Sequence, residues 1–457
     1  MNANEMSPKI HFQLNPINKV SGNFSAVFFA ILFLSAAPLM AAQTSEPPTD
    51  WKTANINALM KLLQNRNYLE FEQAFKAHPD FSPLARDFFA GVLANRQNDV
   101  IQSAQLLEPM LTPLPPGQLP AEQRKLGLLT LADDYVKSFQ YGKAAEAYAH
   151  VLQQFASLLG EQEKKEDIAD CHQICELMKD YPAQTIKTGG PFTVQTKRDA
   201  IGLIEVPIEV GGKTGLAVID TGADITTISL TRAHQLGLKI SEGTTLVGGA
   251  AGAKFRCHTA LIPLLKIGNA EIHNLAAIVM DDKDLYVAEA HFQIEVVIGY
   301  PVVAALGCVT FYADGRIDAN QSTNKQGAEM FMEGNKPWIA AKTRKGVRLF
   351  FLDTGAPRTT MYDLYWNENR DVFAGANLGT IQFLGAGGNR DIPGFLAAEV
   401  PLVFGTIPVV LHNIAVLTKP HTDAPEVLYG CLGQDLLRPL RSWSLDFRSM
   451  RFQIEAN

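Results

Sequence analysis

One four-residue phrase, Asp-Thr-Gly-Ala, occurs twice in this chain of 457 residues and constrains its fold more than any other feature. The copies are Asp220–Ala223 and Asp353–Ala356, and an apolar run of four residues leads into each aspartate. A carboxylate at the end of a buried strand is costly unless another group uses it. Two such sites in one chain predict that the two aspartates meet.

Other features recur in the same order around both aspartates, which indicates an internal duplication. A predicted hairpin precedes each aspartate, and a glycine-rich segment, a His-Asn pair and an apolar-apolar-Gly triplet follow it. The glycine-rich segments are 248–252 and 385–388, the histidines are His273 and His412, and the last glycines are Gly299 and Gly433. The copies are predicted to be residues 200–319 and 338–457, with linkers at 186–199 and 320–337.

The duplicated pattern resembles the aspartic proteases of the retropepsin and pepsin group over residues 196–457. Retropepsins build one site from two chains, whereas pepsins fuse two lobes, and this chain resembles a fused pair of units near the retropepsin size. The resemblance implies an all-β, pseudo-twofold, bilobal acid-protease domain with the active site between the lobes. The substrate would be an extended peptide bound by strand-like hydrogen bonds.

The resemblance also implies roles for the repeated phrase. Two carboxyl groups at hydrogen-bonding distance cannot both ionise readily, so they share a proton and can activate a water molecule between them. No cofactor, metal or covalent intermediate is required. By resemblance the catalytic pair is Asp220 and Asp353, and the supporting residues are Thr221, Gly222, Thr354 and Gly355. The threonines would bond across the lobes, and the glycines would let backbone approach the carboxylates.

The glycine-rich segments are candidates for flaps, which are hairpins that close over the substrate and exclude water. The candidate residues are Gly248, Gly249, Gly252, Gly385, Gly387 and Gly388. The alternative interpretation is that both segments are ordinary surface hairpins. Neither segment contains the tyrosine of pepsin flaps, which favours a retropepsin-like arrangement.

Two departures from the family pattern lead to further expectations. Ala223 and Ala356 stand where acid-optimum pepsins carry a hydroxyl that can lower the carboxylate pKa, so activity is expected to extend toward neutral pH. Asp224, the acid after the first motif, is replaced in the second by Pro357 and Arg358, and the charge of Arg358 suggests an ion pair with Asp435 that braces the second lobe.

Residues 43–185 are predicted to form an all-α domain, because apolar residues recur three and four positions apart without strand alternation. The pattern resembles degenerate tetratricopeptide repeats, with Ile101 in place of one repeat tyrosine. The expected packing residues of the best copy are Leu128, Leu131, Ala132, Tyr135, Tyr141, Ala144 and Tyr148. Such a domain would either bind a protein partner on a concave surface or support the domain that follows.

Residues 1–42 have the pattern of a signal peptide. Two lysines precede an apolar run over 24–40, and Ala41 and Ala42 offer a cleavage site. The alternative is an uncleaved membrane anchor formed by residues 24–42. The protein is therefore expected to be exported to the periplasm or secreted, with contact to a membrane only if the segment is retained.

Composition excludes some classes of function. A net charge of -7 and a pI near 5.8 argue against a nucleic-acid partner. The five cysteines are too few and too scattered for a disulfide framework, and buried small side chains are the simpler interpretation.

The sequence therefore predicts an exported aspartic endopeptidase that hydrolyses peptide bonds through a water held between Asp220 and Asp353. The alternative is a non-catalytic peptide-binding or scaffolding protein that retains the acid-protease fold. Retention of two buried acids and two threonines favours the enzyme, because a binding module has no use for them.

Overall fold

The structure is a computed structural model that describes residues 51, 53–78, 80–111, 119–159, 167–249, 254–321, 326–385, 388–421 and 427–457. The predicted signal segment and the candidate flap residues Gly252 and Gly387 lie outside the described residues. Across the described ranges, no helix is long and apolar enough to cross a membrane.

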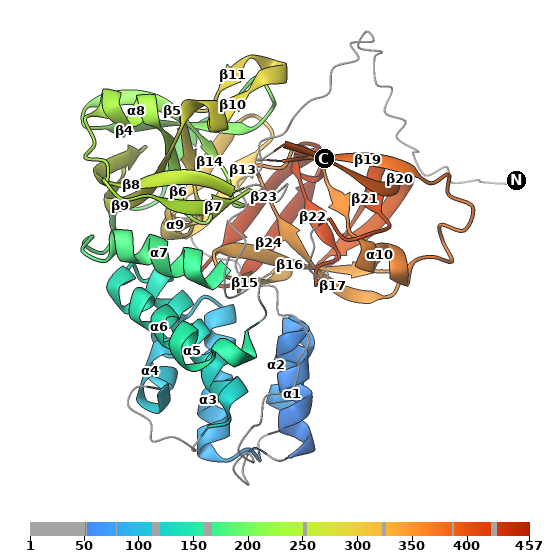
Figure 1. The fold of residues 1–457 in the computed structure, drawn as a ribbon. Coiled ribbons are helices and arrows are strands. Elements are labelled where there is room, and N and C mark those ends of the chain that lie inside the picture. Colours follow the sequence, from blue (N-terminus) through green and yellow to red (C-terminus); the bar gives the residue numbers. More distant parts are fainter. Residues whose placement is uncertain are drawn as a thin grey trace, which may run out of the picture.

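Seven helices form the N-terminal part of the described chain, and consecutive helices pack beside one another (Figure 1). Their bounds are α1 (Ala54–Gln64), α2 (Tyr68–Ala77), α3 (Pro83–Arg96), α4 (Val100–Leu111), α5 (Ala121–Lys137), α6 (Tyr141–Gln154) and α7 (Ile168–Met178), with a 3-10 turn η2 (Ala156–Leu158) after α6. The side chains of Thr53, Asn67 and Ser82 cap the first three α-helices by accepting a backbone N–H bond.

The helical prediction for this region is confirmed, whereas the tetratricopeptide resemblance stays a prediction. All seven expected packing residues of α5 and α6 are buried. Ile101 is 69 % exposed, because α4 turns Ser103, Leu107 and Met110 into the core instead. Cys171 and Cys175 lie on α7, and all five cysteines are buried and free.

The first β lobe is a sheet whose centre carries the first aspartate. The strands follow the order β1-β9-β6-β12-β5-β4-β8-β7, and β3 pairs with β4. Their bounds are β1 (Thr185–Lys187), β3 (Lys197–Arg198), β4 (Ile204–Val210), β5 (Lys213–Ile219), β6 (Thr226–Ser229), β7 (Thr245–Gly248), β8 (Lys254–Ile267), β9 (Ala270–Met280) and β12 (Val296–Ile298). Smaller elements are α8 (Leu230–Leu236), η4 (Asp282–Leu285), β10 (Tyr286–Val287), η5 (Ala288–Ala290), β11 (Phe292–Gln293) and α9 (Tyr300–Ala305).

The second lobe repeats these pairings strand for strand. Its elements are β16 (Lys336–Thr343), β17 (Gly346–Leu352), β18 (Thr360–Met361), α10 (Asp363–Glu368), β19 (Gly379–Gly385), β20 (Gly388–Phe404), β21 (Ile407–Leu417), β22 (Gly430–Leu432) and α11 (Gln434–Leu437). The order β19-β20-β21-β18-β22-β17-β16 matches β7-β8-β9-β6-β12-β5-β4, and the parallel pairs β5–β12 and β17–β22 correspond. The sequence offsets and the strand pairings therefore describe the same duplication.

A run of six strands joins the two lobes, and part of it lies in the segments predicted as linkers. The order is β15-β24-β23-β13-β14-β2. The bounds are β2 (Phe192–Gln195), β13 (Cys308–Tyr312), β14 (Arg316–Ala319), β15 (Ala328–Glu333), β23 (Leu440–Asp446) and β24 (Arg451–Ala456). Strands β1 to β3 overlap the segment expected as linker 186–199, and β15 lies in the segment 320–337. These strands were missed because each is short and its neighbours come from distant parts of the chain.

The repeated His-Asn pair has a structural cause. Asn274 and Asn413 have φ angles of 56° and 55° within β9 and β21, and neither takes part in the strand register. Asparagine tolerates this left-handed conformation better than most residues, so it suits an irregularity in a long strand. His273 and His412 therefore lie beside a kink that both lobes share, and away from the aspartates.

The helical region packs against both lobes (Figure 1). Helix α7 contacts β7 and β8 of the first lobe, while α3 contacts β15. Tyr68 of α2 lies against Phe331 and Trp338 of the second lobe, with ring centroids 6.2 and 5.6 Å apart. One cluster of buried apolar side chains extends from the helices into both lobes.

Candidate active site

Each aspartate extends from the end of a buried central strand. The Asp220 N–H donates to the Ile298 carbonyl at 3.0 Å, and the Asp353 N–H donates to the Leu432 carbonyl at 3.0 Å. Both acceptors lie on the strand that runs parallel to the aspartate's own strand. The apolar-apolar-Gly triplets thus fix where each aspartate leaves its sheet.

The two carboxyl groups meet between the lobes, as the repeated phrase predicts. A side-chain hydrogen bond joins Asp220 and Asp353. The Gly222 N–H donates to Asp220 Oδ1 at 2.7 Å, and the Gly355 N–H donates to Asp353 Oδ1 at 2.8 Å. A Cβ on Gly355 would lie 2.6 Å from the Asp220 carboxylate, and one on Gly222 would lie 2.7 Å from Asp353 Oδ1. Only glycine leaves room for this approach.

The two threonines tie the loops together in a reciprocal arrangement. The Thr221 N–H donates to Thr354 Oγ1 at 3.0 Å, and the Thr354 N–H donates to Thr221 Oγ1 at 3.1 Å. Each hydroxyl then donates to a carbonyl of the other lobe, Leu352 at 2.7 Å and Ile219 at 2.9 Å. All four groups are buried, so the bonds hold the two aspartates in one register.

Burial raises the pKa values of both carboxyl groups, whereas their mutual contact acts on the two in opposite directions. Desolvation raises the pKa of Asp220 well above its usual value, and the neighbouring charge of Asp353 raises it further. Desolvation also raises the pKa of Asp353 to about 6, although hydrogen bonds from Asp220 and the backbone oppose the shift. The dyad therefore holds one proton over a range near neutral pH.

Two glycines allow a strand to pass directly beside each aspartate loop. A Cβ on Gly299 would lie 2.7 Å from the Ala223 carbonyl oxygen, and one on Gly433 would lie 2.7 Å from the Ala356 carbonyl oxygen. The backbone of the next residue bonds to the same oxygens, with Tyr300 donating to Ala223 at 2.9 Å and Gln434 to Ala356 at 2.8 Å. Any larger side chain would push the loop away from the dyad.

Both glycine-rich segments belong to hairpins. In the first lobe β7 pairs with β8 up to Gly248 and Lys254, and in the second lobe β19 pairs with β20 up to Gly385 and Gly388. Gly249 directly follows β7. The hairpins match the predicted secondary structure, and a role over the substrate stays a prediction.

The expected Arg358–Asp435 ion pair does not form. Asp435 Oδ1 accepts bonds from the N–H and hydroxyl of Thr359, at 2.8 and 2.6 Å, and Arg358 is exposed. The threonine satisfies the carboxylate locally, so the charge of the arginine stays in solvent. The opposite charges of Arg358 and Asp435 were therefore not sufficient to predict an ion pair.

Two charged residues near the dyad were not found from the sequence. Lys336 Nζ lies 3.5 Å from Asp224 Oδ2, and both side chains are largely buried. The positive charge of Lys336 also acts on Asp353 and lowers its pKa. Asp224 lies in the first lobe and Lys336 begins β16 of the second, and no periodic signal in the sequence would have paired them.

Comparison with known proteins supports the assignment for the first lobe. Residues 206–302 match a family model described as aspartyl protease. The matched segment begins before Asp220 and ends after Gly299, so it contains one aspartate loop and its partner glycine. No curated protein matches the chain. The match supports an aspartic protease function, and hence a peptide substrate, for this chain.

Proposed function

We propose that the protein is an aspartic endopeptidase whose catalytic dyad is Asp220 and Asp353. The observation that carries the proposal is the hydrogen-bonded pair of buried carboxyl groups, held by reciprocal threonine bonds between two loops of the same sequence. Two carboxyl groups this close serve no purpose in packing, because burying them costs free energy that an apolar pair would not.

In the proposed first step, the two aspartates act in opposite protonation states. The ionised carboxylate accepts a proton from a water molecule held between them, and the water oxygen attacks the carbonyl carbon of the peptide bond. The protonated carboxyl group donates its proton to the carbonyl oxygen, which gives a tetrahedral diol. The backbone bonds from Gly222 and Gly355 keep each carboxyl group oriented during this exchange.

In the second step, the diol collapses and the dyad returns to its starting state. A diol hydroxyl gives its proton back to the ionised carboxylate as the new carbonyl forms, and the other carboxyl group protonates the leaving nitrogen. The C–N bond breaks, and the products are a carboxylic acid and an amine. One proton is again shared by the pair, so no cofactor or covalent intermediate enters the cycle.

The remaining elements fit this proposal as follows. The two lobes would be related by a pseudo-twofold axis between the aspartates, and Gly248, Gly249, Gly385 and Gly388 would lie in flaps over the substrate. The helices would be degenerate tetratricopeptide-like repeats that support the lobes and could present a surface to a protein partner. Export through residues 1–42 is part of the proposal and is supported by their sequence pattern alone.

The experiment is cleavage of a peptide library by the purified protein between pH 4 and 8, with and without a statine-type inhibitor. The expected result is cleavage that the inhibitor suppresses, because its hydroxyl mimics the diol. For the dyad variants Asp220→Asn and Asp353→Asn in the same assay, the matched control is Asp363→Asn on α10, outside the dyad, which should cleave like the unmodified protein. A folded protein that binds the inhibitor but cleaves nothing would favour the scaffolding alternative and contradict the proposal.

A further inference from the structure

The loops that follow the two aspartates occupy corresponding positions, but beyond the alanine they differ in sequence and in burial. In the first lobe Ala223, Asp224 and Ile225 are 2 %, 0 % and 6 % exposed. In the second lobe Pro357 is half-buried and Arg358 is exposed. A duplicated fold would leave both loops equally open, so something outside the duplication covers the first loop.

The helical region provides that cover. Burial raises the pKa of Asp224 to about 6, Lys336 opposes the shift, and the charge of Asp133 on α5 adds to it. Tyr300 links the same loop to the helices, because its N–H donates to the Ala223 carbonyl at 2.9 Å and its hydroxyl donates to Asn98 Oδ1, between α3 and α4, at 2.6 Å. Ala223 also belongs to the buried apolar cluster that the helices share. The helical region therefore lies against the loop after Asp220.

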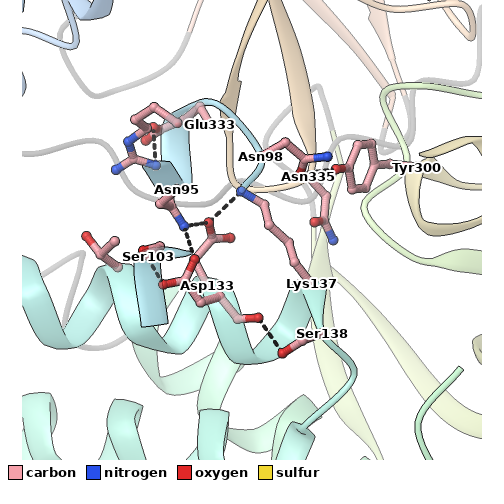
Figure 2. Close-up of polar contacts among 12 residues, drawn as sticks. Asn95, Asn98, Ser103, Asp133, Lys137, Ser138, Tyr300, Glu333 and Asn335 are labelled. Carbon is pink, nitrogen blue, oxygen red and sulfur yellow. Dashed lines mark hydrogen bonds and ion pairs between the residues drawn. The ribbon is translucent and has the colours of Figure 1, made fainter. Parts of the chain in front are cut away.

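The turn between β15 and β16 completes the cover from the second lobe. Asn335 Nδ2 donates to the Asp224 carbonyl at 2.9 Å, beside the Lys336 contact. Glu333, at the start of the same turn, pairs with Arg66 and Arg96 at 3.0 Å each and accepts a bond from the Tyr68 hydroxyl. Figure 2 shows Glu333 and Asn335 of this turn close to Asn95 and Asp133 of the helices. The turn is thus held between the helices and the first loop.

The same helical region also holds the hairpin formed by β7 and β8. Asp170 of α7 forms an ion pair with Lys254, the first residue of β8 and the partner of Gly248. The Tyr181 hydroxyl, just after α7, lies 3.0 Å from Thr259 Oγ1 on the same strand. Val247 of β7 belongs to the apolar cluster that the helices share. The helices therefore contact both the hairpin and the loop of the first lobe.

We propose that the helical region closes one end of the peptide-binding cleft, so that the substrate enters and extends only through the end beside Pro357 and Arg358. An extended peptide at the dyad must pass between a hairpin and the loops after the aspartates, and at the closed end the helices contact both. The proposed endopeptidase activity would then be restricted to peptide bonds close to one end of a polypeptide chain. This inference rests on the proposed function of the same site.

The position of the cover sets how many residues fit at the closed end. Asp224 is the fourth residue after Asp220, and a strand spans about 3.3 Å per residue, which gives roughly 13 Å at most. An extended substrate covers the same distance with about four residues. The cleft should therefore accept no more than about four residues on one side of the scissile bond and longer segments on the other.

The test measures binding rather than turnover. Fluorescent peptides with a central statine are lengthened by alanines, two to eight residues at a time, on the N-terminal or the C-terminal side only. Affinity for the purified full chain should fall at least about 30-fold when one side exceeds about four residues, while lengthening the other side changes it less than threefold. Equal tolerance on both sides would overturn the closed end and leave the proposed dyad standing. Failure to bind any statine peptide would overturn both proposals.

Two matched variants test whether the helices set the limit. Asp170→Lys places a like charge beside Lys254 and should push α7 from the hairpin, so the over-long peptide should bind at least about fivefold more tightly than before. Glu176→Lys is the control, because Glu176 lies on the same helix and pairs with Lys179 within the helical region. If Asp170→Lys binds the over-long peptide no better than Glu176→Lys, the closure by α7 is refuted.

Discussion

The two aspartate loops share a sequence and a hydrogen-bond pattern, yet their surroundings differ. Asp224 follows the first phrase and is buried against Lys336, whereas Pro357 takes the corresponding place in the second. Leu203 holds the same position relative to Asp220 that Lys336 holds relative to Asp353. Asp224 and Lys336 therefore form a buried ion pair, whereas the corresponding positions, Pro357 and Leu203, carry apolar residues.

The hydrogen bonds that hold the two carboxyl groups are the same in both lobes, whereas the residues around them differ. The bonds of the threonines and the glycine N–H groups are repeated on both sides at closely similar lengths. The next residues along the two loops, Asp224 and Pro357, differ because only the loop after Asp220 lies against the helices. The hydrogen bonds are therefore alike at the two carboxyl groups, and the two loops begin to differ at Asp224.

The largest expected effect comes from breaking the buried ion pair. Lys336→Met should lower the free energy of unfolding at pH 7 by about 3 to 5 kcal/mol, because Asp224 then lacks a buried partner. The loss should shrink at pH 5, where Asp224 is protonated. Urea unfolding at both pH values measures it, with the exposed Lys342→Met on the same strand as control. Equal losses at pH 5 and pH 7 would mean that the charge of Asp224 is not involved.

A second prediction concerns the pH dependence of peptide cleavage. Because burial raises the pKa values of both carboxyl groups, that of Asp353 to about 6, the singly protonated dyad persists above pH 6. Below pH 6 both carboxyl groups are protonated and no base remains, so kcat/KM should fall about tenfold per pH unit, about 100-fold at pH 4. A maximum near pH 2 would contradict the raised pKa values.

The third prediction tests the symmetric part of the comparison. Thr221→Val and Thr354→Val each remove a hydroxyl that accepts one buried N–H bond and donates to one buried carbonyl. Each should cost about 2 to 3 kcal/mol of unfolding free energy, and the two losses should agree within about 0.5 kcal/mol. Thermal and urea unfolding report both values. If the two variants lose unfolding free energies that differ by more than one hydrogen bond contributes, the two loops are not equivalent.

The smallest effects distinguish the covered loop from the open one. Asp224 has a folded pKa of about 6 against about 3.9 when unfolded, so its contribution to stability is greatest below pH 4 and is lost as the pH rises to 6. Asp224→Asn should remove up to about 2 to 3 kcal/mol of that pH dependence. Arg358→Ala should change stability by less than about 0.5 kcal/mol at any pH. An unchanged pH slope in Asp224→Asn would contradict the buried position of this carboxyl group.

The sequence predicted the parts of the site that repeat and missed the parts that do not. Asp220, Asp353 and their threonines were found because one phrase occurs twice after apolar strands. Lys336 was missed because an ion pair between distant segments leaves no mark on local periodicity. The expected pair of Arg358 with Asp435 was wrong because Thr359, next to the arginine, satisfies the carboxylate. Ile101 fitted a repeat register by its offset alone, and offset does not tell which face of a helix is buried.

The most direct test of the central claim compares Asp220→Asn with Asp353→Asn in the same peptide-cleavage assay. If both lobes supply one active site, each variant alone should lose at least about 1000-fold in kcat/KM while the protein stays folded, because neither carboxyl group can act without the other. If either variant retains more than a tenth of the activity, the two aspartates do not form one catalytic dyad.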